Sequence, residues 1–545
     1  MTMASSPPSA VHPTLAILLV VGIFTFLAAV FAVTGKRPAK QTTWLGIGTL
    51  KWLSALGLVV LAAVLVTGLN AAHPLMDKNY AAVFVTTSGW LLVAKLTITC
   101  LILAIALRIH IVSLPTIAND PESATTAKRS LRRWVVVEGI LTLPLLWAGH
   151  MVANEHPPNH AVIYTWPYPF RFSIMNTWGM AMLDAVIGVW VAITLLIIAG
   201  AITLRALMKG GRSSWRFGLP TVLVVLALAV GAYALSIKAY PETYRDTPVP
   251  FKSESVAHAM TIFAENCVPC HGHQAKGDGI LSKTLPKKPI DLLTEPHATM
   301  HTPGDFFHWL TNGVPGTGMP AWGEKFSDKE RWDLVNLIHA INRGYQARIM
   351  NTRILPNQPF LAPPGFSYTT HDGTTGRLKD FRGEKAVLLV LFSWPDSRDR
   401  LDQLRLAYPS LRDHKAEVLA VPLTELTSQQ IADIGKDIPF PLVEKEAAEI
   451  ARTYSLFRRT ISHPDLMGPA TVPKHMEFLF DRFGYLRARW IPETDGTGWK
   501  DIDFLTQQVD QLNQEKEILP PPTDYVQEAI HEMHMGGMDM GGMKM

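Results

Sequence analysis

Six apolar stretches crowd into the first 240 residues of this 545-residue chain and constrain its fold more than any other feature. Each is long enough to cross a bilayer as a helix, which takes about 20 residues. The first stretch lacks a basic start and a small-residue cleavage site, so we expect it to remain in the protein. The sequence therefore predicts a six-helix transmembrane bundle over residues 1–240. The stretches cover residues 14–34, 44–69, 89–111, 131–152, 173–207 and 217–236.

Basic residues gather beside three of the connections between these stretches. Short cytoplasmic loops carry an excess of Lys and Arg, so we expect these three connections in the cytoplasm. Both termini and all residues after 236 then face the periplasm of a bacterial inner membrane. The basic residues are Lys36, Arg37, Lys40, Arg108, Lys128, Arg129, Arg132, Arg133, Arg205, Lys209, Arg212 and Arg216.

The connections predicted to face the periplasm are rich in histidine, with methionines such as Met76 and Met151 nearby. Imidazole and thioether groups together suit copper better than magnesium or calcium. Two interpretations stay open: a copper site, or the interfacial residues of ordinary loops. The histidines are His73, His150, His156 and His160.

Three ionisable residues, Lys95, Glu138 and Asp184, fall inside the predicted spans. Charges at that depth are costly and usually face a bundle interior or a cavity. A buried ion pair and an ion path both account for them.

Part of the membrane region resembles a known family. The stretches "TTSGWLLVAKLTITCLILAIALRIHIVSLP" and "LRRWVVVEGILTLPLLWAGHMVANEHPP" are similar to the core of the CopD copper-resistance membrane proteins. The resemblance covers about residues 60–160 and implies copper handling at the membrane. The histidine-bearing early helix typical of that family has no evident counterpart here.

A short motif after the proline-rich linker at residues 241–251 defines the next segment. "CVPCHGHQAKGDG" contains Cys267, Cys270 and His271 in the Cys-x-x-Cys-His spacing that attaches a c-type haem. Downstream, "GVPGTGMPAW" supplies Met319 as a second axial ligand, which suits electron transfer. Residues 252–345 thus resemble an all-α class I cytochrome c, and a capping box of Ser327 and Glu330 is predicted to open its last helix.

Alternating strand and helix patterns follow over residues 346–517 and predict an α/β domain with helices on both faces of a sheet. The order resembles the thioredoxin fold and, within it, the SCO copper chaperones. That family's Cys-Pro-Asp-x-Cys motif is replaced by residues 394–398, Trp-Pro-Asp-Ser-Arg. His475 stands where the family has its third copper ligand.

Without cysteines this domain cannot exchange disulfides, because the reaction needs a thiolate. Three roles stay open: a docking or structural domain, a weaker metal site that uses His475, and a spacer for the tail.

The tail, residues 518–545, ends in a tract rich in histidine and methionine. Thioethers favour Cu(I), and imidazoles also hold Cu(II). Copper binding competes with a disordered tail whose methionines are incidental or scavenge oxidants. The candidate ligands are His531, Met533, His534, Met535, Met538, Met540, Met543 and Met545.

These parts together predict a membrane-anchored periplasmic mono-haem cytochrome that transfers electrons and takes part in copper handling, with no substrate turnover of its own. Its expected partners are copper ions and a redox protein such as a cytochrome or terminal oxidase. The net charge of +4 is small for a chain of this length, and the basic residues do not form one basic face, so nucleic acid is not an expected partner. The rival hypothesis is a respiratory electron-transfer or accessory subunit with no copper role.

Overall fold

The computed structural model describes most of the chain in segments. These are residues 46–76, 80–119, 124–158, 161–173, 183–208, 215–294, 301–358, 361–465 and 472–526, with the single residues 22, 27, 30, 31 and 177. The chain divides into two compact units, Met1–Ile163 and Tyr164–Met545.

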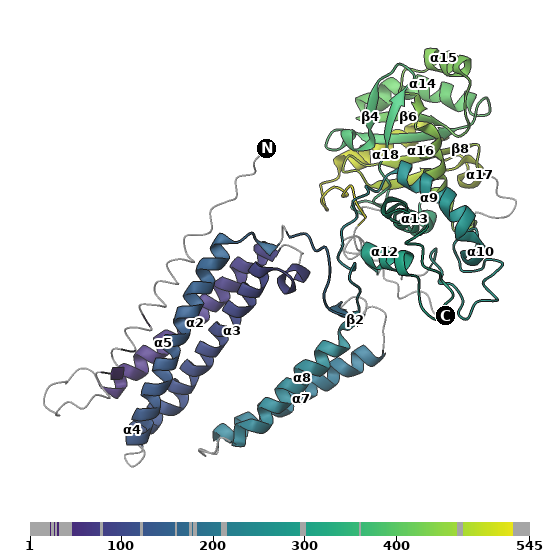
Figure 1. Cartoon of the computed structure of the whole chain (residues 1–545). Helices are drawn as coiled ribbons and strands as arrows, with labels where there is room; N and C mark the ends of the chain where they lie inside the picture. Colours follow the sequence, from purple (N-terminus) through teal and green to yellow (C-terminus); the bar gives the residue numbers. More distant parts are fainter. Residues whose placement is uncertain are drawn as a thin grey trace. The chain divides into compact units, whose positions relative to one another are not determined.

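Unit 1 is a bundle of long apolar helices (Figure 1). Many of their large apolar side chains, such as Val59 and Leu143, are exposed, as expected of helices that face lipid. Small buried clusters hold the helices together, one of them formed by Leu61, Ile102 and Leu145. The elements are α2 (Ile47–Met76), η1 (Tyr80–Phe84), α3 (Thr87–Arg108), η2 (Ile109–Ser113), α4 (Leu114–Asn119) and α5 (Ala124–Asn154).

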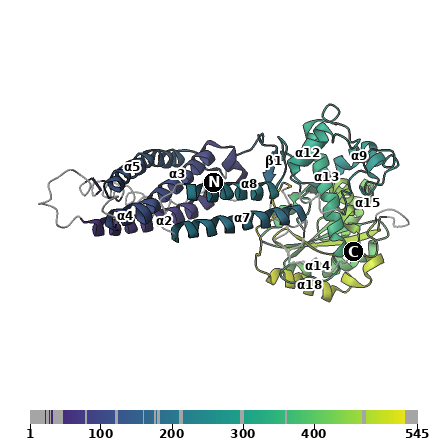
Figure 2. The same ribbon diagram turned by 90° about the horizontal axis from the view of Figure 1, so that it is seen from below.

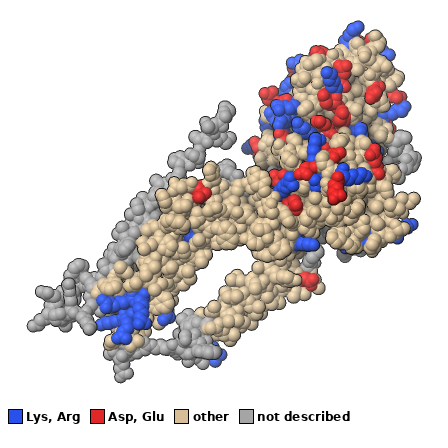
Figure 3. Space-filling model, viewed as in Figure 1, with Lys and Arg blue, Asp and Glu red and all other residues tan. Residues whose placement is uncertain are grey.

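Lysine and arginine side chains gather at one end of unit 1, where Figure 1 labels α4 (Figure 3). Two arginines there lie over aromatic rings, Arg108 over Trp134 at 5.2 Å and Arg132 over Phe31 at 4.8 Å. Such contacts let a charged head stay at the water boundary while its stem covers apolar surface.

Unit 2 begins with a short antiparallel strand pair and a helical hairpin. Strands β1 (Phe170–Phe172) and β2 (Ser236–Lys238) pair with each other, and α7 (Leu183–Met208) and α8 (Trp215–Ala234) run side by side (Figures 1 and 2). The hairpin is apolar along its length, so it continues the membrane-type composition of unit 1.

Four helices in the described segments are long and apolar enough to cross a membrane: Ile47–Pro74, Thr87–Asn119, Thr125–Asn154 and Leu183–Ala206. A fifth, shorter apolar helix, Gly218–Ala234, coincides with the last predicted span. Most of the first predicted span, residues 14–34, lies outside the described residues.

The described residues of the cytochrome-like segment form four helices joined by loops. Helix α13 begins with the predicted capping box, in which Ser327 and Glu330 each bond to the other's backbone N–H. Helix α12 begins with a second capping box, formed by Thr302 and Asp305. The helices are α9 (Ser253–Asn266), α10 (Val268–His271), α12 (Pro303–Asn312) and α13 (Asp328–Gln346), followed by the turn η4 (Ala347–Ile349).

The thioredoxin-like segment is built on a four-stranded sheet in the order β6-β5-β8-β9, in which only the β5–β6 pair is parallel. A second sheet has the order β4-β3-β7. The strands are β3 (Ser367–Thr370), β4 (Thr375–Arg377), β5 (Ala386–Phe392), β6 (Ala416–Pro422), β7 (Val443–Lys445), β8 (His475–Phe480) and β9 (Leu486–Trp490). The helices and turns are η5 (Leu378–Phe381), α14 (Arg398–Asp413), α15 (Ser428–Asp437), α16 (Ala447–Tyr454), η6 (Ser455–Arg458), α17 (Pro492–Asp495), η7 (Gly498–Lys500) and α18 (Ile502–Gln514).

The cytochrome-like and thioredoxin-like segments share one hydrophobic core. A single cluster contains Val256 and Ile338 from the first and Tyr454 and Phe478 from the second. Polar bonds join them as well: the Arg343 guanidinium donates to the Ala362 carbonyl at 2.8 Å, and the Thr453 hydroxyl donates to the Ser253 carbonyl at 3.1 Å. The two segments therefore pack together as one body.

Candidate haem site

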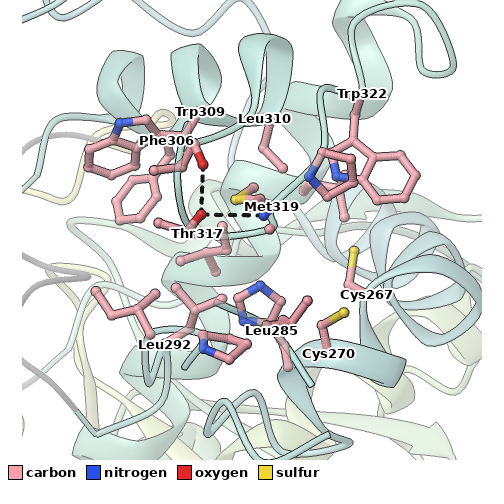
Figure 4. Close-up of a pocket in the computed structure, with 18 of the residues that line it drawn as sticks. Cys267, Cys270, Leu285, Leu292, Phe306, Trp309, Leu310, Thr317, Met319 and Trp322 are labelled. Atoms are coloured by element: carbon pink, nitrogen blue, oxygen red, sulfur yellow. Dashed lines mark hydrogen bonds between the residues drawn. The ribbon is translucent and has the colours of Figure 1, made fainter. Parts of the chain in front are cut away.

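A cavity of about 320 Å³ opens inside the cytochrome-like segment. Its walls come from α9, α12, α13 and the loops that carry the two predicted ligand motifs (Figure 4). Most lining side chains are apolar, so water is largely excluded from the space. The labelled wall residues in Figure 4 are Cys267, Cys270, Leu285, Leu292, Phe306, Trp309, Leu310, Thr317, Met319 and Trp322.

The two thiols and His271 are brought together by one turn of helix. The Cys270 and His271 amides both donate to the Cys267 carbonyl, at 3.2 and 2.8 Å. Gly272 ends this turn at φ +76°, and a Cβ there would lie 2.0 Å from a carboxylate oxygen of Asp278. Only glycine fits this position.

Burial also sets the protonation of these groups. It raises the pKa of Cys267 to about 12, with the neighbouring Cys270 adding to the shift. Burial lowers the pKa of His271 more than the backbone carbonyl of Ile290 raises it. The imidazole is therefore neutral at physiological pH, which is the form that binds a metal.

Met319 is held by a bonded loop at the cavity. The Thr317 hydroxyl donates to the Val314 carbonyl at 2.7 Å and accepts from the Met319 amide at 3.3 Å, as the dashed lines in Figure 4 show. The Val314 amide in turn donates to the Met319 carbonyl at 3.2 Å. Gly318 has φ +86°, and a Cβ there would lie 2.9 Å from Leu285, so this loop also depends on a glycine.

The donor set and the cavity fit a haem c. Two thiols lie at the rim, a neutral imidazole follows them directly, and a thioether lines the same apolar space. The structure thus brings together all four residues predicted from the motifs, Cys267, Cys270, His271 and Met319. Sequence reasoning missed the wall contributed by α12, including His301 just before it; the amphipathic run "DFFHWL" at residues 305–310 was the available signal.

The position of the lost disulfide motif holds a closed polar network in the thioredoxin-like segment. His475 is buried, with Nδ1 3.1 Å from the Ser397 hydroxyl and Nε2 2.8 Å from Glu477 Oε1. Arg400 donates to both oxygens of Glu477, at 2.7 and 2.9 Å. Both imidazole nitrogens of His475 therefore have partners within the protein.

The charge of Arg400 helps to lower the pKa of Glu477. Burial alone would raise the pKa of this carboxyl, but the Arg400 charge and the hydrogen bonds from His475 and Arg400 outweigh it and lower the pKa to about 2. Sequence reasoning missed both residues, although a glutamate inside the apolar strand run "HMEFLF" signals a buried partner.

The remaining candidate metal ligands are spread out or undescribed. His73, His150 and His156 are exposed, and His150 Nε2 lies 3.3 Å from the Asn154 amide nitrogen. Within the described segments, no three His, Cys, Asp or Glu side chains come together as metal ligands. His160 and all the tail candidates from His531 to Met545 lie outside the described residues.

The ionisable residues of the membrane region are placed separately. Glu138 is buried, and Lys95 Nζ lies close to Gly149, where an added Cβ would be 3.9 Å away. Among the ion pairs between described residues of unit 1, none joins Lys95 to Glu138. Asp184 is exposed at the start of α7 in unit 2.

Family models match three separate parts of the chain. Copper resistance protein D matches residues 47–149, cbb3-type cytochrome c oxidase subunit III matches residues 254–338, and the AhpC/TSA family matches residues 361–489. No curated protein matches the chain. The chain is a fusion of CopD-like, cytochrome c and thioredoxin-like segments.

Solved structures resemble parts of this fusion. BsSco, a member of the Sco family of cytochrome c oxidase assembly proteins, is 12% identical over 29% of this chain and 99% of its own, with a TM-score of 0.22. A putative thiol:disulfide interchange protein DsbE from Chlorobium tepidum is 16% identical over 28% of this chain and 99% of its own, with a TM-score of 0.20. The Kuenenia stuttgartiensis reducing HAO-like protein complex is 26% identical over 23% of this chain and 60% of its own, with a TM-score of 0.16.

The fusion defines the coarse character of the molecule. Its cytochrome c segment implies a covalent haem c, and copper is suggested by its CopD-like segment alone. The apolar helices and the CopD match support an inner-membrane protein. The fusion is therefore a membrane-bound, copper-related cytochrome.

Proposed function

We propose that this fusion is a periplasm-facing cytochrome that exchanges single electrons with a redox partner and uses them in copper handling. The convergence of Cys267, Cys270, His271 and Met319 on one apolar cavity carries the proposal. The thiols of Cys267 and Cys270 would hold the haem through thioether bonds, and His271 and Met319 would hold its iron. Bound there, the haem would supply one-electron transfer.

The chain's own residues define what this site does. Phe306, Trp309 and Leu310 exclude water from the cavity, and the Thr317 hydroxyl holds the Met319 backbone in place. Because His271 and Met319 would both hold the haem iron, no position on it would be open to a substrate. The site is therefore suited to relaying electrons and not to turnover.

In this proposal the electron reduces copper. Cu(II) takes up one electron to become Cu(I), the form that thioether ligands prefer. In this proposal a reduced partner cytochrome would supply the electron through this site, and Cu(II) would accept it. The histidines and methionines of residues 531–545 would capture the metal, and His73, His150, His156 and His160 would receive it at the membrane.

The thioredoxin-like segment has a structural role in this proposal. Its core is continuous with that of the cytochrome segment, and Arg343 of the cytochrome segment donates to the Ala362 carbonyl. His475 already has two partners, which favours docking over a metal site. The same observation supports the second candidate, a respiratory electron-transfer subunit without copper.

A paired titration tests the proposal. The purified full chain and a variant ending at Ile530 are reduced, freed of excess reductant and mixed with Cu(II) under anaerobic conditions. We expect one haem oxidised for each Cu(I) formed, and copper retained after gel filtration by the full chain but not by the shortened one. A full-length variant with every methionine of residues 533–545 replaced by leucine separates loss of ligands from loss of length.

The outcomes distinguish the two candidates. If neither form retains copper and ferrous haem is not oxidised by Cu(II), the copper role is wrong and the respiratory subunit remains. If the purified chain has no thioether-linked haem absorbance, both candidates are wrong.

A further inference from the structure

The strand pair β1–β2, here called the collar, has two faces of opposite character. Along β1 the side chains alternate: Phe170 and Phe172 are 42% and 49% exposed, whereas Arg171 between them is 2% exposed. Across the pair, Phe170 lies opposite Lys238 and Phe172 opposite Ser236. Because side chains along a strand alternate between faces, the two phenylalanines form an outer face and Arg171 belongs to the inner one.

The inner face holds the helix that forms one wall of the haem cavity. Arg171 lies 3.8 Å from Asp305 of α12, and both side chains are buried. Asp305 also accepts from the Thr243 hydroxyl at 2.5 Å and takes part in the capping box at the start of α12. Phe306, the next residue of α12, lines the cavity. The collar is therefore joined to the cavity through one buried ion pair.

Contacts just beyond β2 strengthen this hold on α12. The Tyr240 ring stacks on His308 with centroids 4.2 Å apart, and His308 Nδ1 lies 2.7 Å from a carboxylate oxygen of Glu242. Tyr240 also contacts the edge of Trp309, another cavity residue, at 5.8 Å. Neither the collar nor this stretch can tilt without moving the cavity wall.

The outer face continues the surface of the apolar helices. The Ser173 amide, next to Phe172, donates to the Leu235 carbonyl at 3.0 Å, so β1 is bonded to the end of α8. Tyr233 in the last turn of α8 is 83% exposed. Exposed aromatic rings and a lysine directly after a membrane helix are typical of the layer where lipid headgroups meet acyl chains.

We propose that the outer face of the collar seats in the headgroup layer of the bilayer and, through Arg171 and Asp305, fixes the haem cavity at one angle to the membrane plane. The occupant of this face is lipid because its aromatic residues are continuous with the surface of α8 and are bonded to the end of that helix. The cytochrome is then an oriented body and not a domain that tumbles on a tether. A redox partner would meet the haem from one constant direction.

Oriented bilayers test this. The full chain is reconstituted in phosphatidylcholine multilayers dried on a flat support, and the paramagnetic resonance of the ferric haem is recorded while the support is rotated. We expect a strong dependence on angle in the unmodified chain and about a twofold broadening of the orientation distribution in Phe170→Ser/Phe172→Ser, because the headgroup anchor is lost. Haem absorbance is compared first, so that an unfolded or haem-free variant is recognised.

Two matched variants complete the design. Phe170→Trp/Phe172→Trp keeps aromatic rings at the interface and should restore the narrow distribution. Leu406→Ser/Ile461→Ser removes two exposed apolar side chains from the thioredoxin-like segment and should leave it unchanged. The proposal is overturned if the unmodified chain shows no angular dependence, or if the serine pair keeps the full dependence with intact haem.

Discussion

Around the haem cavity, the thiols of Cys267 and Cys270 and the sulfur of Met319 border an apolar space of about 320 Å³. On β8, by contrast, the side chains of His475 and Glu477 are buried and bonded to Ser397 and Arg400 at the start of α14. Both sites belong to the same compact unit. The first is built to receive a group that the chain does not supply, and the second is closed on itself.

The contrast concerns a thioredoxin-like segment that lacks the cysteines of disulfide chemistry. A thioredoxin-like sheet without thiolates cannot exchange disulfides, yet the buried positions near the lost motif still need satisfied polar groups. The Ser397–His475–Glu477–Arg400 network meets that need with partners of its own. The segment also packs against the cytochrome-like segment through a shared cluster of buried apolar residues.

Removing the two thiols at the haem cavity should have the largest effect. Cys267→Ala/Cys270→Ala leaves no atom for thioether bonds, so we expect covalent haem to be lost completely. Haem staining after denaturing electrophoresis measures it. Cys100→Ser removes the remaining cysteine, which lies exposed in α3, and should retain all the haem. Haem that stayed covalently bound in the double variant would contradict the assigned attachment site.

Changing Met319, the second proposed ligand of the haem iron, should have the next largest effect. Met319→His replaces a thioether by an imidazole, and the midpoint potential should fall by on the order of 0.2 V, since axial ligands tune haem over roughly 0.8 V. Redox titration followed by absorbance measures the shift. Met260→Leu, which packs against the core but does not line the cavity, is the control. An unchanged potential in the histidine variant would exclude Met319 as a ligand.

The four predicted haem ligands line one cavity, and the sequence could point to them because the information in their motifs is local. Cys267 and His271 lie within one turn of helix, and the glycines around Met319 mark a loop that only certain backbone angles allow. The capping box of Ser327 and Glu330 is likewise a four-residue pattern, and it is confirmed. Patterns of this length need no knowledge of the rest of the chain.

Long-range contacts could not be predicted in the same way. The Arg171–Asp305 pair joins residues of two segments far apart in sequence, and the continuity of Val256 with Tyr454 depends on which apolar face meets which. Apolar periodicity shows that a helix has a buried face but does not name its partner. The Arg400–Glu477 pair was missed for the same reason.

Breaking the closed network should destabilise the thioredoxin-like segment by about 3–5 kcal/mol. Glu477→Leu leaves Arg400, which is 9% exposed, as a buried charge without its carboxylate. Urea unfolding followed by tryptophan fluorescence measures the loss. The matched variant Arg400→Met/Glu477→Leu removes both charges and should recover most of the stability. Equal losses in the two variants would show that the loss comes from packing and not from the unpaired charge.

Acid should weaken the same network by protonating Glu477. The pKa of Glu477 is lowered from 4.5 to about 2 when the chain folds. A lowered folded pKa adds stability above the unfolded value, and this is lost as pH falls from about 4.5 to about 2. The contribution is about 3 kcal/mol. Urea midpoints at several pH values, compared with those of Arg400→Met/Glu477→Leu, isolate it. Parallel curves for the two proteins would rule it out.

The smallest effect concerns the loop that holds Met319. Thr317→Val removes the hydroxyl that bridges the Val314 carbonyl and the Met319 amide, and the unfolding free energy should fall by about 1 kcal/mol. Thr284→Val also removes a hydroxyl bonded to a backbone carbonyl, but an exposed one, and should change stability by less than about 0.5 kcal/mol. Both are measured by urea unfolding of the haem-loaded chain. The same hydroxyl bridge should also keep Met319 on the iron. Carbon monoxide, which competes with methionine for ferrous haem, should therefore bind faster to Thr317→Val than to the unmodified chain. If Thr317→Val binds carbon monoxide no faster than Thr284→Val, the hydroxyl bridge does not position the ligand.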